Sequence, residues 1–332
     1  MKLATLKITQ PKTASERLDG RLAVVSSDGR YAVPVPPEAF PNLLAALEDW
    51  EHAEPRLRAI DAQLSEGRAR EAVDLTHAQL LAPLPRTFGW IDGSAFIQHV
   101  LLVRKARGAQ PPEDLKTVPL MYQGAGDFLL GPTDDVPMID EAHGMDFESE
   151  VAVILDETPM GVTPAEAAGH VKLLVIMNDV SLRNLIPREL AAGFGFFQSK
   201  PASSLGPFAV TPDELGGAWR DGRVHLELRT TYNGKLFGHP NAGEMHFSFF
   251  DLVAHAAKTR RLSAGTILGS GTVSNADESV GSSCLAEKRM IEKIQGGEMR
   301  TPFMKAGDRV EIEMLQGGAS VFGKISQKIV QV

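Results

Sequence analysis

The first part of the chain alternates short apolar runs with turn residues. Apolar and β-branched residues dominate residues 3–8, 21–26 and 31–35, and Gly, Asp and Pro separate these runs. Runs of this length and composition are typical of short strands, so we expect a small β-domain at the start of the chain.

The pattern then becomes helical. From residue 41 to about 76 apolar side chains recur at the spacing of a helix face. A proline inside a helix removes a hydrogen bond and clashes with the preceding turn, so Pro55 is expected to divide this segment into two helices. The proline-rich residues 82–86 predict a linker, which gives domains at 1–82 and 83–332.

The second domain is expected to contain a pair of buried strands. Val, Ile and Phe dominate residues 145–155, and a second apolar run covers residues 173–177. Between them, Thr163 and Glu166 have the spacing of a capping box, which predicts the start of a helix. Another Thr-Pro-Asp-Glu sequence begins at Thr211 and predicts a second, short helix.

More strands are expected toward the end of the chain. The pattern predicts them at 224–232, 310–314 and 321–325, with Asn233–Gly234 as a hairpin turn and a helix at 247–259. The fold class that we predict is therefore α+β and β-rich.

Composition excludes several classes of function. The chain has 332 residues, 43% of them apolar, and a formal net charge of -8. This negative charge argues against binding to nucleic acid or to an anionic membrane. Cys284 is the only cysteine, so an intrachain disulfide and a thiolate metal cluster are excluded. No apolar run reaches eighteen residues and the first ten residues alternate like a strand, so we expect a cytoplasmic protein.

Three acidic residues mark the candidate chemistry. Glu148 and Glu150 share one face of the strand predicted at 145–155, and Asp179 follows the next apolar run. When two carboxylates are held this close, one of them must stay protonated unless a cation lies between them, and oxygen ligands suit Mg²⁺, Mn²⁺ or Ca²⁺. The alternative is a solvated edge strand, with Asp179 and Arg183 as an ordinary helix pair.

Other polar residues have structural alternatives of the same kind. Asp92 stands before a helix expected to end near Lys105 and could be its N-cap. His99 on that helix could be an ordinary histidine, and Lys200 could extend to solvent. Residues 119–124 are expected to be a loop lining a site. The glycine-rich residues 268–274 lack the Gly-Lys-Ser/Thr ending of a phosphate loop, and their glycines are expected to allow a close backbone approach.

Taken in order, these motifs resemble those of the fumarylacetoacetate hydrolase family. They are the Glu-x-Glu at Glu148, the Asn-Asp-x-Ser-x-Arg at 178–183, Lys200 and the Gly-Ser-Gly-Thr at 269–272. The seven-residue spacing of Asp92 and His99 also looks like that of true fumarylacetoacetases. The resemblance implies a mixed β-roll, a partly open barrel, preceded by a small SH3-like β-domain.

The resemblance also implies roles for individual residues. The metal ligands would be Asp92, Glu148, Glu150 and Asp179. His99, oriented by Glu287, would be the general base, while Arg183 and Lys200 would stabilise an oxyanion. Tyr122 and Thr272 would bind substrate.

The implied activity is hydrolysis of a C–C bond in a small β-diketo acid during aromatic catabolism, such as tyrosine degradation. The cofactor would be one divalent cation, magnesium in first place with calcium or manganese as alternatives, and the protein would be a homodimer. Ile186 replaces a family glutamine and Ser94 a family tyrosine, so both fumarylacetoacetate and a related acylpyruvate stay open as substrates. A hydratase, decarboxylase or isomerase of 2-oxo acids on the same scaffold is the alternative, and a binding protein without the chemistry is a third.

Overall fold

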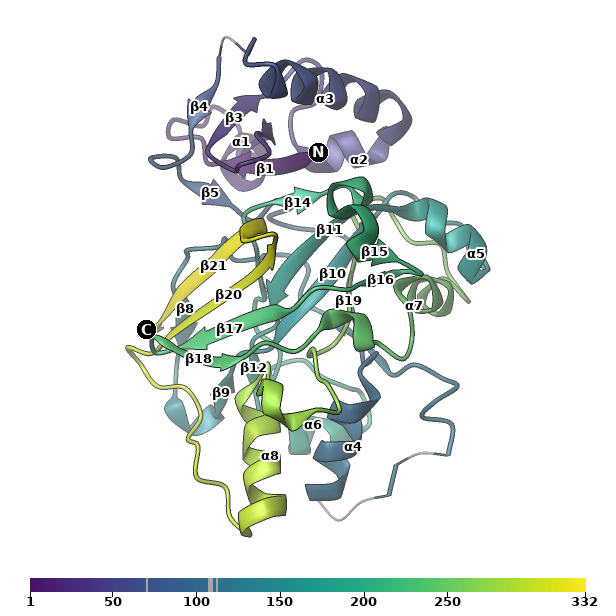
Figure 1. The fold of residues 1–332 in the computed structure, drawn as a ribbon, viewed down its shortest axis with the longest axis vertical. Helices are drawn as coiled ribbons and strands as arrows, with labels where there is room; N and C mark the ends of the chain where they lie inside the picture. Colours follow the sequence, from purple (N-terminus) through teal and green to yellow (C-terminus); the bar gives the residue numbers. More distant parts are fainter. Residues whose placement is uncertain (70, 107–109, 112) are drawn as a thin grey trace.

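The N-terminal part forms an antiparallel sheet covered by helices. The computed structural model describes residues 1–69, 71–106, 110–111 and 113–332 (Figure 1). The elements of this part are β1 (Lys2–Leu6), α1 (Ala14–Asp19), β2 (Arg21–Val25), β3 (Tyr31–Pro34), α2 (Leu43–Glu48), α3 (Trp50–Ser65), β4 (Val73–Asp74) and β5 (Leu80–Leu81). The three predicted strands are confirmed as β1, β2 and β3. Leu22 and Val24 of β2 belong to the same buried cluster as Leu43 of α2 and Leu57 of α3.

The helical prediction for residues 41–76 was right only as far as Ser65, because residues 73–74 form β4, and the expected break at Pro55 was wrong. Pro55 lies inside α3, and the two helices meet at Asp49, whose φ of -134° and ψ of 48° are not helical. The ring of Pro55 faces the carbonyl of Glu51 in the first turn of α3, and Glu51 is exposed, so water can satisfy that carbonyl.

The N-terminal sheet continues directly into the sheet of the second domain. β1 pairs with β14 (Ala209–Val210), and the strand order runs β4-β3-β2-β1-β14-β11-β10-β19-β6-β7. Arg58 of α3 also donates two hydrogen bonds to the carboxylate of Asp213 across this junction. An N-terminal domain is therefore present, but it shares a sheet with its neighbour. The domain limits 1–82 and 83–332 stay a prediction.

The middle of this long sheet is buried, whereas its last strand is not. The strands of this part are β6 (Trp90–Gly93), β7 (Met121–Gly124), β10 (Ser149–Leu155), β11 (Val171–Asn178) and β19 (Ile267–Gly269), and β7 at the end of the order has no buried residue. Every residue of β10 is buried, as are the last six of β11, which explains their nearly unbroken apolar sequences. The strand predicted at 145–155 is thus confirmed from Ser149 on, while Met145–Asp146 forms the separate short strand β9, which pairs with β12 (Ser181–Leu182).

A second, open sheet packs beside the first. Its order is β18-β17-β20-β21-β8, formed by β8 (Val136–Met138), β17 (Leu228–Tyr232), β18 (Lys235–Gly238), β20 (Arg309–Gln316) and β21 (Ala319–Gln331). The predicted turn is confirmed, because Asn233 and Gly234 join β17 to β18 with φ of 49° and 74°. The β-rich α+β fold is confirmed, with open sheets and no closed barrel among the described residues.

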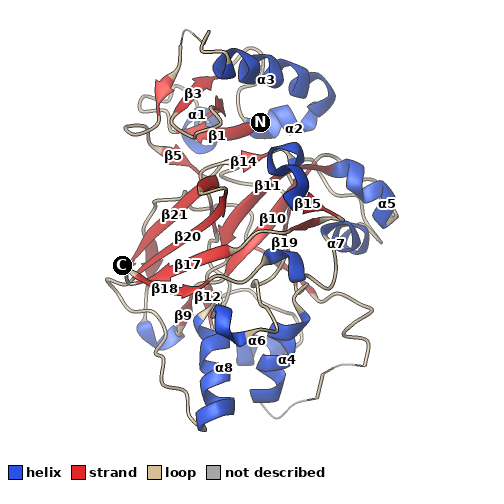
Figure 2. Ribbon diagram, in the orientation of Figure 1, coloured by secondary structure: helices blue, strands red, loops and turns tan. Residues whose placement is uncertain are grey.

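Helices lie around the edges of the two sheets (Figure 2). They are α4 (Ile97–Ala106), α5 (Pro164–Ala167), α6 (Ile186–Ala192), α7 (Phe249–Ala256) and α8 (Leu285–Gly296). The capping box of Thr163 and Glu166 is present at α5, and the short 3₁₀ helix η3 (Pro212–Ala218) follows Thr211, as predicted. In the part of the chain that the structure describes, no helix is long and apolar enough to cross a membrane.

The remaining elements are short. They are η1 (Glu141–His143), η2 (Ala168–His170), β13 (Ser204–Leu205), β15 (Trp219–Arg220), β16 (Arg223–Val224), η4 (Ala242–Glu244) and η5 (Glu278–Val280). The strand expected at 224–232 is therefore interrupted, because β16 and β17 are separate strands.

Candidate active site

Three acidic residues meet where neighbouring strands of the long sheet begin and end. β10 runs antiparallel to β11, so Glu150 near its start lies beside Asp179, which follows the last residue of β11. β6 runs parallel to β19, and Asp92 pairs with Gly269 at the end of that strand. Carboxylate oxygens of Asp92, Glu150 and Asp179 lie within 4.8 Å of one another, and all three residues are buried.

This cluster fits a divalent cation. Neither carboxylate oxygen of Glu150 has a hydrogen-bond partner among the described residues, although both are buried. Burial, together with the negative charge of Asp179, raises the pKa of Asp92 to about 8. Burial and the charges of Asp92 and Asp179 raise the pKa of Glu150 as well. A cation with hard oxygen ligands would remove both the repulsion and the unmet acceptors.

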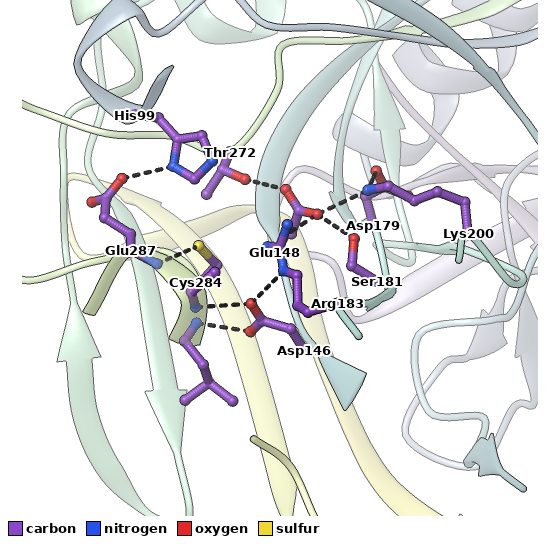
Figure 3. A network of polar contacts seen from close by, with 12 residues as sticks. His99, Asp146, Glu148, Asp179, Ser181, Arg183, Lys200, Thr272, Cys284 and Glu287 are labelled. Carbon is purple, nitrogen blue, oxygen red and sulfur yellow. Dashed lines mark hydrogen bonds and ion pairs between the residues drawn. The ribbon is translucent and has the colours of Figure 1, made fainter. Parts of the chain in front are cut away.

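Glu148 has a different environment from the other predicted ligands. Its carboxylate lies 2.8 Å from Nζ of Lys200 and 3.2 Å from Nη2 of Arg183. Ser181 and Thr272 donate hydrogen bonds to its two oxygens (Figure 3). Burial alone would raise the pKa of Glu148, but the two cations hold it well below its usual range. The structure therefore brings three of the four predicted ligands together and leaves Glu148 paired with positive side chains.

These positions exclude the structural alternatives for the acidic residues. Glu148 and Glu150 are buried, so they are not the solvated face of an edge strand. Asp179 and Arg183 do not form a helix pair, because residues 181–182 are a strand and α6 begins only at Ile186. Asp92 is not an N-cap either: it lies inside β6, and its Oδ1 accepts a hydrogen bond from the backbone N–H of Gly271.

The glycine-rich loop has the close backbone approach that the sequence predicts. Gly271 has a φ of 77°, and a Cβ there would lie 2.4 Å from the carbonyl oxygen of Gly93. A Cβ on Gly269 would lie 2.7 Å from Oδ1 of Asp92. Both glycines are therefore needed for the loop to contact the strand that carries Asp92.

His99 and Glu287 form a pair beside the carboxylates. Nδ1 of His99 on α4 lies 2.8 Å from Oε2 of Glu287 on α8, and the two helices pack together. The side chain of Glu287 is 3% exposed and that of His99 is 17% exposed. This contact leaves Nε2 of His99 for the cavity, which is the arrangement of a general base oriented by an acid.

A cavity of about 140 Å³ is lined by seven of the ten predicted site residues, but not by Glu150, Asp179 or Glu287. Its lining combines charged, polar and apolar side chains: Asp92, Ser94, Phe96, His99, Tyr122, Glu148, Arg183, Ile186, Phe196, Lys200, Gly271 and Thr272. Ile186 and Ser94, the two departures from the family pattern, both line it. Thr272 lines it too, although its hydroxyl is directed to Glu148.

Tyr122 and Lys200 close one side of this cavity. The hydroxyl of Tyr122 donates to Oδ2 of Asp179 over 2.5 Å, and Nζ of Lys200 lies 2.6 Å from the same oxygen. Lys200 is 7% exposed and so does not extend to solvent. The expected loop at 119–124 was wrong, because residues 121–124 form β7, which pairs with β6, and the turn residues come only afterwards.

Sequence reasoning missed Asp146. Its carboxylate is buried, accepts hydrogen bonds from the backbone N–H groups of Leu285 (2.7 Å) and Ala286 (2.9 Å), and lies 2.9 Å from Nε of Arg183 (Figure 3). It thus fixes the start of the helix that carries Glu287 and also fixes the arginine. The sequence feature that could have identified Asp146 is its position in an apolar stretch, two residues before Glu148.

The comparisons with known proteins identify the family. The model of the fumarylacetoacetate (FAA) hydrolase C-terminal domain matches residues 89–330, and that of fumarylacetoacetase N-terminal domain 2 matches residues 1–86. The chain belongs to the fumarylacetoacetate hydrolase family, whose relatives include hydrolases, isomerases and tautomerases.

Individual relatives differ in activity. The 2,4-didehydro-3-deoxy-L-rhamnonate hydrolase of Sphingomonas sp. (strain SKA58) is 27% identical over 74% of this chain and 78% of its own. Oxaloacetate tautomerase YisK of Bacillus subtilis (strain 168) is 25% identical over 72% and 70%. The fold is similar to that of maleylpyruvate hydrolase from Sphingobium sp. SYK-6 in complex with manganese(II) and pyruvate, with a TM-score of 0.64, 20% identity and coverage of 100% and 99%.

Proposed function

We propose that this protein hydrolyses a C–C bond in a β-diketo acid with the help of one divalent cation. Fumarylacetoacetate and acylpyruvates are the proposed substrates, and Mg²⁺ is the proposed ion, with Mn²⁺ and Ca²⁺ as alternatives. The observation that carries the proposal is that one cavity is lined both by His99, which is paired with Glu287, and by Asp92, which belongs to the three-carboxylate cluster. A base for water and a site for a metal are the two components that this hydrolysis requires.

The roles of the side chains follow from their positions. Asp92, Glu150 and Asp179 would hold the ion, with Glu148 as a further oxygen donor. When bound, the ion supplies Lewis acidity toward the two oxygens of the diketo group.

His99 takes a proton from water at Nε2, and the resulting hydroxide adds to the acyl carbonyl carbon. Glu287 stabilises the imidazolium that this transfer produces. Arg183 and Lys200 supply positive charge where the carbonyl oxygen becomes negative.

Cleavage of the C–C bond follows the addition of hydroxide. The bond between the acyl carbon and the neighbouring methylene carbon breaks, and its electron pair stays on the methylene carbon as an enolate. The proton held by His99 returns to that carbon. The products are one carboxylic acid from the acyl half and one keto acid from the other half.

A tautomerase of 2-oxo acids is the second candidate, because YisK is an oxaloacetate tautomerase. That reaction needs a proton carrier and an enolate-stabilising ion but no attack by water.

One experiment separates the two candidates. The purified protein is given acetylpyruvate, fumarylacetoacetate or enol-oxaloacetate, each with Mg²⁺, with Mn²⁺ and with EDTA. Loss of enol absorbance is followed, and the products are identified. Cleavage of a diketo acid into two acids, abolished by EDTA, supports hydrolysis. Rapid ketonisation of oxaloacetate without cleavage of either diketo acid would replace the proposal by the tautomerase.

A further inference from the structure

A larger aromatic chamber adjoins the candidate active site. It measures about 1060 Å³, and four phenylalanines line it: Phe88, Phe194, Phe196 and Phe197. The chamber and the smaller cavity share Tyr122, Phe196 and Lys200 in their walls. A ligand that reaches out of the smaller cavity past these side chains therefore meets aromatic surface.

The loop between α6 and Lys200 carries three of these rings, and its second half is hydrogen-bonded to Glu189. Both oxygens of Glu189 on α6 accept hydrogen bonds from this loop, through the backbone N–H groups of Phe197 (3.0 Å), Gln198 (2.6 Å) and Ser199 (3.2 Å). Gly193 and Gly195 turn the chain with φ of 79° and 91°. The hydrogen bonds to Glu189 and the two glycine turns therefore give this loop a defined conformation.

The rings are unusually accessible for their size. Phe194 is 99% exposed and Phe197 is 84% exposed. Leaving such rings in water forgoes the free energy that their burial would gain, and contiguous exposed apolar surface commonly marks a binding site. Phe196 extends this surface inward: its ring packs edge-on against Tyr122, with centroids 5.1 Å apart. Tyr122 in turn contacts Asp179 of the carboxylate cluster.

We propose that the aromatic chamber binds the acyl end of the substrate and selects a planar acyl group, either aryl or α,β-unsaturated. This inference rests on the proposed function and names the part of the substrate that this region recognises. The diketo acid end lies at the carboxylate cluster, so an acyl group longer than methyl extends along Tyr122 and Phe196. Flat π systems pack on aromatic rings in offset or edge-on geometry, whereas a bulky saturated group cannot.

The test compares acetylpyruvate, whose acyl group is a methyl ketone, with benzoylpyruvate. Kd is measured by calorimetry on Mg²⁺-loaded protein carrying His99→Ala, and KM is measured on protein with His99 intact. Phe196→Ala and Phe197→Ala are each expected to raise the Kd for benzoylpyruvate by about fivefold and the Kd for acetylpyruvate by less than about twofold. Phe128→Ala is the matched control, since Phe128 is 54% exposed but lies outside the lining of the chamber.

The outcomes separate this inference from the proposed function. Absence of acetylpyruvate cleavage with His99 intact would refute the hydrolase, while the ratio of the two Kd values still decides the subsite. An equal loss of affinity for both compounds would overturn the proposed subsite. A loss of affinity no larger than that of Phe128→Ala would also overturn it. A change from dimer to monomer in Phe194→Ala and Phe197→Ala, with an unchanged Kd ratio, would also overturn it and assign this surface to contact with a second copy.

Discussion

Nδ1 of His99 lies 2.8 Å from Oε2 of Glu287, although 188 residues separate them in the sequence. The contact joins α4 to α8 beside the candidate cavity and holds the imidazole ring by its Nδ1 edge. Because the carboxylate of Glu287 is nearly buried, the ring can exchange protons only from its other side.

Removing either member of the pair is expected to affect proton transfer without affecting metal binding. His99→Ala should lower kcat by about 10²- to 10⁴-fold, the usual contribution of a general base. Glu287→Gln keeps the size of the side chain but removes the charge that stabilises the imidazolium, so it should lower kcat to a smaller extent. Calorimetric titration with Mn²⁺ should give the same Kd for both variants as for the wild type. Unchanged turnover in His99→Ala would remove the assigned role.

Glu150 provides a test of the metal site that does not depend on activity. Its two oxygens are buried without a hydrogen-bond donor among the described residues and lie beside two other acids. Glu150→Gln removes one carboxylate from the cluster, so without metal this variant should have a higher Tm than the wild type.

With metal the order should reverse. A ligand at about 100 times its Kd adds about 2.7 kcal/mol of stability, and Glu150→Gln should lose most of this gain. Thermal unfolding with EDTA and with Mg²⁺ measures both effects. An equal rise in Tm with Mg²⁺ in the two proteins would show that Glu150 is not a ligand.

Asp146 is expected to act through the residues that it holds in place. Asp146→Asn keeps the shape of the side chain but loses the ion pair with Arg183 and one acceptor for the start of α8. We expect kcat to fall by at least about tenfold, because the arginine and Glu287 both lose their fixed positions.

The matched control is Asp251→Asn. Asp251 accepts a hydrogen bond from Ser248 at the start of α7 and does not line the candidate cavity. This variant should lose about 1 kcal/mol of stability, the usual value for a helix cap, at an unchanged kcat. If the two variants lose kcat to the same extent, Asp146 has only a structural role.

The ion pair between Arg58 and Asp213 at the domain junction makes a pH-dependent contribution to folding stability. Its hydrogen bonds hold the pKa of Asp213 well below the usual range. A carboxyl group whose pKa is depressed by folding stabilises the fold above its unfolded pKa, about 3.9, and loses this effect as the pH falls through the folded value. Both side chains are more than a third exposed, so the contribution is about 0.2–1 kcal/mol and falls with salt.

Asp213→Asn should therefore lower Tm slightly at pH 7 in low salt. The difference from the wild type should shrink as the pH falls below about 4 and at high salt, as linkage and screening require. Thermal scans of both proteins across this range measure the effect. A Tm difference independent of pH and salt would show that the pair is not electrostatic.

The sequence pattern placed Glu150 and Asp179 together, whereas the place of Asp92 in the cluster rested on the family resemblance. The apolar runs before Asp179 and after Glu150 identify buried strands, and their ends bring the acids together. The pairing of His99 with Glu287 rested on the family resemblance, since no local pattern relates residues on separate helices. The prediction of a helix break at Pro55 was wrong, because a proline near the start of a helix faces only a solvent-accessible carbonyl.

Other features depend on tertiary contacts that no spacing encodes. Asp146 was missed because its partners are the backbone of α8, 139 residues away, and Arg183. Glu148 has the same strand spacing as Glu150 but a different environment, because Lys200 and Arg183 approach only one of the two. The aromatic chamber likewise forms only when the loop after α6 lies beside β7.

The most direct measurement is the ¹H NMR spectrum of acetylpyruvate incubated with the Mg²⁺-loaded protein, followed over time beside His99→Ala. The account predicts that acetate and pyruvate appear in equal amounts with the wild type, that EDTA stops their formation, and that the variant forms almost none while binding metal normally. Conversion of the enol to the keto form without acetate, or equal cleavage by the variant, would contradict it.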